Sequence, residues 1–167
     1  MGLSKLISSN HMIQMLNIAD NGIGNKGLEF ITDAIIAQQS LVYLNIENNN
    51  LTSKCLPSIK KLLCKLSSIV DLWLGKNEID DSLPIEVSYQ IFKPYCKLKR
   101  LELNENNLSE IGINAVFEAM VNNKSIEYLN FEGSFKCGID RIRMPYLNLM
   151  LQTNETLKHL NISNCGI

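Results

Sequence analysis

One spacing of apolar residues recurs along the chain and constrains its fold more than any other feature. In the clearest copy, residues 98–108, apolar residues occupy the first, fourth, sixth and eleventh positions and asparagine occupies the ninth. Successive copies are 28, 28, 29, 28 and 31 residues apart. They begin at Ile13, Leu41, Ile69, Leu98, Ile126 and Leu157. A period of this length predicts a stack of similar units that bury their apolar side chains against one another.

Each unit is predicted to contain a short strand and then a helix. The alternating apolar residues of each copy are typical of a strand, and the segments that follow carry apolar residues at helical spacing. Thr52 or Ser53, and Ser109, are placed to cap two of these helices. The predicted inward-facing helix residues include Leu28, Ile31, Ile35, Leu56, Ile59, Leu63, Ile113, Val116 and Met120.

The repeats use nearly the whole chain, which predicts a single domain over residues 1–167. Residues 1–12, with Leu3, Leu6 and Ile7 at helical spacing, fit the helix of a truncated unit, and the last copy closes at Ile167. Both ends therefore cut through a repeat, and we expect the domain to be part of a larger protein or assembly. Because solenoids without polar caps expose apolar edges, we also expect end-to-end self-association.

This motif resembles the leucine-rich repeat, and the 28–29 residue period is similar to that of its ribonuclease-inhibitor-like class. The resemblance implies an α/β solenoid, a horseshoe arc with a parallel sheet on the concave face and helices on the convex face. In this family the ninth-position asparagine bonds to backbone groups of neighbouring turns, and cysteine is an accepted alternative. The ladder here reads Asn21, Asn49, Asn77, Asn106, Ser134 and Cys165, so Ser134 is the departure.

Composition narrows the classes of partner. Sixteen basic and seventeen acidic residues give a net charge of -1, without the basic excess of a nucleic-acid-binding protein. No apolar run approaches the ~20 residues of a membrane-spanning helix, and the N-terminus lacks a secretory signal pattern. We therefore expect neither a nucleic acid nor a membrane as partner.

The cysteines point to a reducing compartment. They are odd in number and scattered at Cys55, Cys64, Cys96, Cys137 and Cys165, without C-x-x-C pairs. Five N-x-S/T sequons argue the other way, but in an Asn-rich chain this signal is weak, and one of them, at Asn161, falls within a predicted strand. We expect a cytoplasmic protein.

No catalytic, cofactor or metal site is predicted. His11 and His159 lie about five repeats apart, and the glycines Gly22, Gly24 and Gly27 match the repeat turn and not a phosphate-binding loop. A Cys165–His159 dyad is set aside because Cys165 occupies a ladder position. We therefore expect a protein that is not an enzyme and binds no cofactor.

One alternative concerns Arg141 and Arg143, in a three-residue insertion after the fifth strand. The activator of the Ran GTPase has this class of repeat, and a loop arginine can stabilise charge in phosphoryl transfer. A GTPase-activating accessory role is thus open, beside the simpler interpretation of a solvated loop. A second alternative is an architectural component of a cytoskeletal assembly.

The favoured function is a protein-binding scaffold, because residues between the strand leucines point away from the core and line the concave face. Acidic residues outnumber basic ones on that face by six to two, which favours a partner with a basic surface. Individual charges can equally serve only solubility, and Trp73 can line the core instead of anchoring a partner. The predicted binding residues are Tyr43, Asp71, Trp73, Arg100, Glu102, Glu105, Tyr128, Glu132 and His159.

Overall fold

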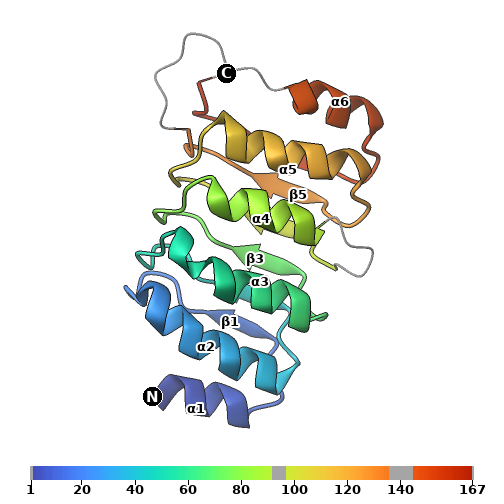
Figure 1. Cartoon of the computed structure of the whole chain (residues 1–167). Helices are drawn as coiled ribbons and strands as arrows, with labels where there is room; N and C mark the ends of the chain where they lie inside the picture. The colour runs from blue at the N-terminus through green and yellow to red at the C-terminus, as the bar shows by residue number, and fades with distance from the viewer. Residues whose placement is uncertain (1, 92–96, 136–144, 167) are drawn as a thin grey trace.

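The computed structural model describes residues 2–91, 97–135 and 145–166, and in these ranges strands and helices alternate along the chain. The elements are α1 (Gly2–Ser9), β1 (Met15–Asn17), α2 (Gly24–Gln38), β2 (Tyr43–Asn45), η1 (Ser53–Cys55), α3 (Leu56–Lys65), β3 (Asp71–Trp73), α4 (Ser82–Ile91), β4 (Arg100–Glu102), α5 (Glu110–Asn122), β5 (Tyr128–Asn130), α6 (Pro145–Thr153) and β6 (His159–Asn161). Figure 1 shows the helices stacked in chain order.

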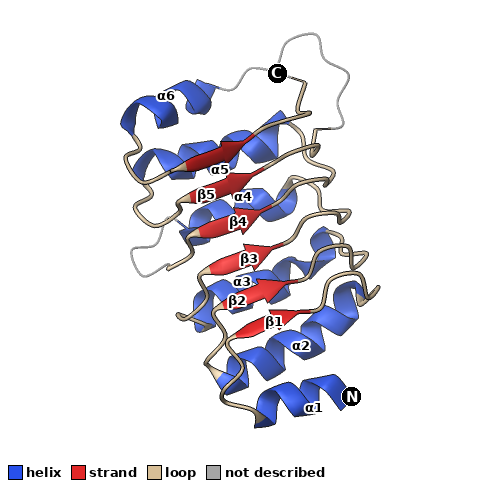
Figure 2. Ribbon diagram, turned by 180° about the vertical axis from the view of Figure 1, so that it is seen from behind, coloured by secondary structure: helices blue, strands red, loops and turns tan. Residues whose placement is uncertain are grey.

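The strands form one parallel sheet in the order β1 to β6, counted over the described residues. The sheet occupies one face of the molecule and the helices the other (Figure 2). Equivalent motif positions pair across every ladder; for example, Tyr43 lies opposite Asp71 and Asp71 opposite Arg100. The predicted α/β leucine-rich repeat solenoid is confirmed.

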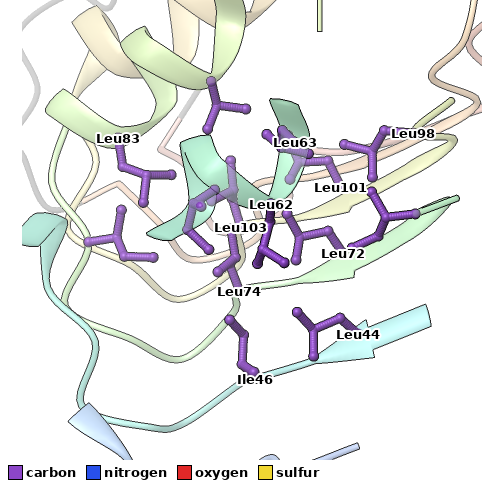
Figure 3. Packing of buried hydrophobic residues seen from close by; sticks show 14 of the residues in the cluster. Leu44, Ile46, Leu62, Leu63, Leu72, Leu74, Leu83, Leu98, Leu101 and Leu103 are labelled. Carbon is purple, nitrogen blue, oxygen red and sulfur yellow. The ribbon is translucent and has the colours of Figure 1, made fainter. Parts of the chain in front are cut away.

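The repeat leucines form a continuous core between sheet and helices. Leu44, Leu72 and Leu101 are fully buried, and Figure 3 shows Leu72 and Leu101 gathered with Leu62 of α3. Full burial of such a side chain contributes roughly 1.5–3 kcal/mol. The predicted helix faces are buried as expected, except that Leu56 is only partly covered. In α1 only Ile7 is buried, whereas Leu3 and Leu6 are exposed.

The ninth-position side chains link each turn to its neighbours. Asn77 is buried, and its Nδ2 donates to the carbonyl oxygens of Ile46, Leu74 and Gly75 at 2.9–3.2 Å. Its Oδ1 accepts from the backbone N–H of Asn49 at 3.0 Å. One side chain thus satisfies backbone groups that the turns would otherwise bury without partners.

Ser134 and Cys165 keep part of this role. The Ser134 hydroxyl donates to the Leu103 carbonyl and accepts from the Asn106 N–H at 3.3 Å. The Cys165 thiol donates to the Phe131 carbonyl at 3.1 Å. Serine at position 134 therefore lacks the hydrogen bonds that asparagine makes within its own turn, but it keeps hydrogen bonds to the preceding coil.

Local sequence signals explain the helix starts. The Ser109 hydroxyl accepts from the Ile111 N–H at 3.1 Å and caps α5, and Thr52 caps η1 in the same way through the Lys54 N–H. Pro57 lies in the first turn of α3, where its missing N–H costs nothing. Among the described residues, no helix combines the length and apolar character needed to cross a bilayer.

Among the described residues no disulfide forms at Cys55, Cys64 or Cys165; Cys96 and Cys137 lie outside the described residues. Burial raises the pKa of the Cys55 thiol to about 12, and burial also raises the pKa of Cys165. Both thiols are therefore protonated at neutral pH and serve as packing groups.

Candidate protein-binding surface

The fold brings the predicted residues together on the open face of the sheet. Tyr43, Asp71, Arg100, Tyr128 and His159 occupy the third motif position of five successive strands and pair in register. Trp73 of β3 and Glu102 of β4 occupy the fifth motif position and pair with each other. Glu105 and Glu132 follow β4 and β5, in the turns that leave the sheet.

Aromatic rings and one guanidinium form a continuous row across the strands. The Tyr43 and Trp73 rings lie 6.0 Å apart, and the Arg100 guanidinium lies 5.5 Å from the Trp73 centroid. The same guanidinium lies 3.6 Å from the Tyr128 centroid, and Tyr128 stacks on His159 at 4.0 Å with an interplanar angle of 5°. We call these five residues the aromatic row.

Arg100 has a larger role than the sequence indicates. Its Nη1 donates to Glu102 Oε1 at 3.1 Å, and its Nε lies 4.0 Å from Asp71 Oδ1. Its guanidinium lies over the rings of both Trp73 and Tyr128, an arrangement suited to a planar cation. Register explains the arrangement, since Arg100 stands beside Tyr128 in its own column and diagonal to Trp73.

Glu102 is one of the binding residues predicted on the concave face, but the structure buries it. Only 3% of the residue is exposed, and Arg100 pairs with its carboxylate. A charge that is already covered and neutralised contributes little long-range field. Glu102 therefore positions Arg100 within the aromatic row.

Trp73 is half-buried on this face, and its ring contacts Tyr43 and Arg100. Within the described residues its Nε1 is buried without a hydrogen-bond acceptor. A buried donor without a partner costs free energy, and buried indole N–H groups usually have one. Other interactions of the fold offset the free-energy cost of this N–H group at the centre of the face.

Carboxylates gather at the edge where the strands end. Glu105 is exposed, 3.9 Å from Lys76, and Glu132 accepts from Asn161 Nδ2 at 3.0 Å. Glu47 accepts from Asn45 Nδ2 at 3.1 Å. We call Glu47, Glu105 and Glu132 the acidic turn edge.

Gly75 shapes this edge. A Cβ atom at Gly75 would lie 2.3 Å from Asn104 Oδ1 and 2.7 Å from Glu47 Oε1. Contacts this short do not occur for real Cβ atoms, so glycine is what lets the two side chains close over the turn. In the sequence, Gly75 occupies the seventh motif position, which carries mostly polar residues in the other copies, and its role at this edge is not evident.

A second charged group lies at the opposite edge, where the strands begin. Lys99 Nζ donates to Glu127 Oε1 at 2.8 Å, and Lys158 Nζ donates to Glu127 Oε2 at 2.7 Å. These three residues, the lysine–glutamate cluster, occupy the second motif position of three successive coils. Sequence reasoning missed them because it considered only later positions, although the column itself is readable from the repeat.

Glu127 gives this cluster a specific pH dependence. Hydrogen bonds from Lys158 and Lys99 lower the pKa of Glu127 from 4.5 to about 2. A carboxyl group whose pKa is lower in the folded state than in the unfolded state stabilises the fold at pH values above its unfolded pKa. This contribution disappears as the pH falls through the folded pKa.

We expect Glu127→Gln to lower the urea midpoint at pH 7. The difference from the parent should be unchanged down to about pH 5 and vanish near pH 2. A difference independent of pH between 7 and 2 would contradict this assignment.

Arg141 and Arg143, on which the GTPase-activating alternative depends, lie outside the described residues. Their placement on the predicted insertion loop therefore stays a prediction.

Comparisons with known proteins place this geometry in a family. Two family models described as leucine-rich repeats match the chain, one at residues 9–31 and 153–167 and the other at residues 40–62. "NACHT, LRR and PYD domains-containing protein 3" of Rattus norvegicus is 26% identical over 133 residues, which are 79% of this chain and 13% of that protein. The Homo sapiens protein of the same name is 24% identical over 166 residues, 99% of this chain and 16% of that protein. The chain thus spans less than a fifth of the length of these curated relatives.

Solved structures agree in fold. A tropomodulin C-terminal domain from Caenorhabditis elegans matches with a TM-score of 0.73 at 11% identity, covering 93% of this chain and 90% of that one. "Leiomodin-1 Actin-Binding Site 2" matches with a TM-score of 0.56 at 18% identity, covering 95% of this chain and 75% of that one. The assignment to the ribonuclease-inhibitor-like class stays a prediction. The repeat models, the relatives and the stacked strand–helix coils together show that this chain contains leucine-rich repeats.

Proposed function

We propose that this chain is a non-enzymatic protein-interaction module that binds its partner on the concave face, around the aromatic row. The observation that carries the proposal is the row itself, in which three aromatic side chains, an arginine and a histidine lie in contact across five strands of an open sheet. Tyrosine, tryptophan and arginine are the residue types that dominate binding energy in protein interfaces. Their mutual contacts also hold them in place before a partner arrives, which lowers the entropic cost of binding.

The charges beside the row favour a partner with basic residues over the acidic turn edge. Glu105 is exposed and its ion pair with Lys76 is long, at 3.9 Å, so its charge still acts on an approaching molecule. Carboxylates at the rim of an interface mainly accelerate association and set its salt dependence. They complement the aromatic row, which supplies the affinity.

Actin is the first partner that we propose to test. The leiomodin fragment that shares this fold is named as an actin-binding site, and the tropomodulin domain matches over nearly the same share of this chain. An actin partner fits the cytoskeletal alternative and a cytoplasmic location. We further propose that residues 1–167 form one repeat domain of a longer protein, in line with the greater length of its relatives.

The test compares one aromatic truncation on each face. We expect Trp73→Ala to raise the Kd for monomeric actin, measured by calorimetry, at least about 30-fold, because truncation of a central anchor costs about 2 kcal/mol or more. The matched control is Tyr89→Ala on helix α4, a residue that is 65% exposed on the helical face. This control should leave the Kd within about twofold.

The two variants separate the outcomes. Equal weakening by both substitutions would place the interface on the helices and overturn the concave-face assignment. If the parent chain does not bind actin, the actin proposal fails. The same two variants then apply to any protein that the parent binds directly in purified form.

A further inference from the structure

The lysine–glutamate cluster presents more positive than negative charge to solvent. Lys99 and Lys158 have side chains that are 57% and 74% exposed, whereas the Glu127 side chain is only 28% exposed. The two lysine side chains are therefore more accessible than the carboxylate to a molecule that approaches this edge. One carboxylate neutralises only one of the two cations.

A groove of about 320 Å³ adjoins this surplus charge. Besides the cluster it is lined by Val70, Asp71, Arg100 and Tyr128. Its volume is roughly that of ten water molecules, enough to admit a side chain. Arg100 already pairs with Glu102 and lies against Tyr128, so the cations that a ligand can engage are the two lysines.

We propose that this groove binds a carboxylate side chain of the protein partner, an aspartate or glutamate that lies between Lys99 and Lys158. This inference rests on the proposed function, which supplies the protein partner, and it adds the direction in which that partner lies across the face. The bound partner carries an acidic residue at the edge where the strands begin and basic residues over the acidic turn edge. The partner can then bind in only one direction across the face.

The local charge favours a carboxylate over a phosphate. Arg100 in this groove is already paired with Glu102, which leaves Lys99 and Lys158 against Glu127, and a single negative charge balances this cluster. Asp71 is a second carboxylate that lines the groove. A phosphate dianion would bring a second negative charge close to both carboxylates, and like charges at short range repel. A carboxylate supplies two oxygens for the two ammonium groups, as Glu127 already does.

The test uses an acetylated and amidated tetraglutamate peptide, titrated at low ionic strength into the ¹⁵N-labelled chain and followed by NMR. We expect saturable shifts of the Lys99, Tyr128 and Lys158 amides. The double variant Lys99→Ser with Lys158→Ser should raise the peptide Kd about tenfold, since two charge contacts are lost. Glu127→Gln should lower the Kd severalfold, because it removes the carboxylate that competes for the same lysines.

The matched control is Lys60→Ser with Lys61→Ser on helix α3. These lysines have side chains that are each 50% exposed, and each pairs with a carboxylate of its own, Lys60 with Glu86 and Lys61 with Asp33. The control should leave the peptide Kd unchanged. Equal weakening by both double variants would show binding by net charge alone and overturn the proposal.

Two further outcomes would also overturn it. One is the absence of saturable shifts at the groove with the parent chain. The other is inorganic phosphate that binds at least as tightly as the peptide and shifts the same amides, which would assign the groove to phosphate. None of these results depends on Trp73→Ala, so failure of the carboxylate groove and failure of the concave-face function are separately visible.

Discussion

Replacing Asn106 with alanine is expected to lower the free energy of unfolding by about 3–5 kcal/mol. The side chain is fully buried, and its Nδ2 donates to the carbonyls of Leu74, Leu103 and Asn104 at 3.0–3.2 Å. Its Oδ1 accepts from the Ile79 N–H at 3.1 Å. Alanine leaves the buried Ile79 N–H without a partner, which costs about 1–3 kcal/mol, and removes the hydrogen bonds to the three carbonyls, at about 0.5–1 kcal/mol each. Each of these carbonyls keeps one other donor, from Asn77, Ser134 or the Lys76 N–H. Urea denaturation followed by circular dichroism measures the loss.

The rest of the ladder provides graded controls. Ser134→Ala removes one donated and one accepted hydrogen bond and should cost less than Asn106→Ala. Asn21→Ala, at an exposed position of the first coil, should cost about 1 kcal/mol or less, because water replaces its contacts. Equal costs at Asn21 and Asn106 would show that burial of the turns does not determine the energy of the ladder.

Arg100→Met is expected to destabilise the fold by about 2–3 kcal/mol, because it leaves the Glu102 carboxylate buried without its cation. The estimate stays below that for a fully buried pair because the Arg100 side chain is 30% exposed and is partly screened by solvent. Adding Glu102→Gln should restore most of the loss, since it removes the stranded charge. The expected signature in a double-mutant cycle is a strongly non-additive pair.

The same variants separate stability from binding. Arg100→Met with Glu102→Gln should fold nearly as well as the parent and yet bind the partner more weakly, because Trp73 and Tyr128 lose the cation between them. If the two substitutions are additive in unfolding free energy, Glu102 does not depend on Arg100. Its burial then needs a different explanation.

The repeat pattern predicts the parts of this molecule that obey one rule in every coil. Leu44, Leu72 and Leu101 recur at the same motif position, and in-register stacking follows once the period is known. The same rule predicts which residues line the open face, and eight of the nine predicted binding residues are accessible on it or on its turn edge, whereas Glu102 is buried. Interactions between neighbouring coils that differ in sequence are much harder to predict.

Glu102 and Glu127 illustrate that difference. Both are glutamates on the sheet side of the molecule, but Arg100 covers one and two lysines from neighbouring coils cover the other. Whether a carboxylate is exposed therefore depends on side-chain conformations across three coils, which no single motif copy contains. Leu3 and Leu6 are a similar case, because helical spacing places them on an apolar face but only Ile7 packs against the neighbouring coil.

The central claim is that a partner binds over Trp73, and the chain offers a direct probe because Trp73 is its only tryptophan. Incorporation of 5-fluorotryptophan gives one ¹⁹F resonance from the centre of the concave face, while an unlabelled partner contributes none. Titration with a partner whose binding is established by calorimetry should shift or broaden this resonance until one equivalent is bound, because the partner excludes water from the ring. An unchanged resonance at calorimetric saturation would contradict the claim and place the partner elsewhere on the molecule.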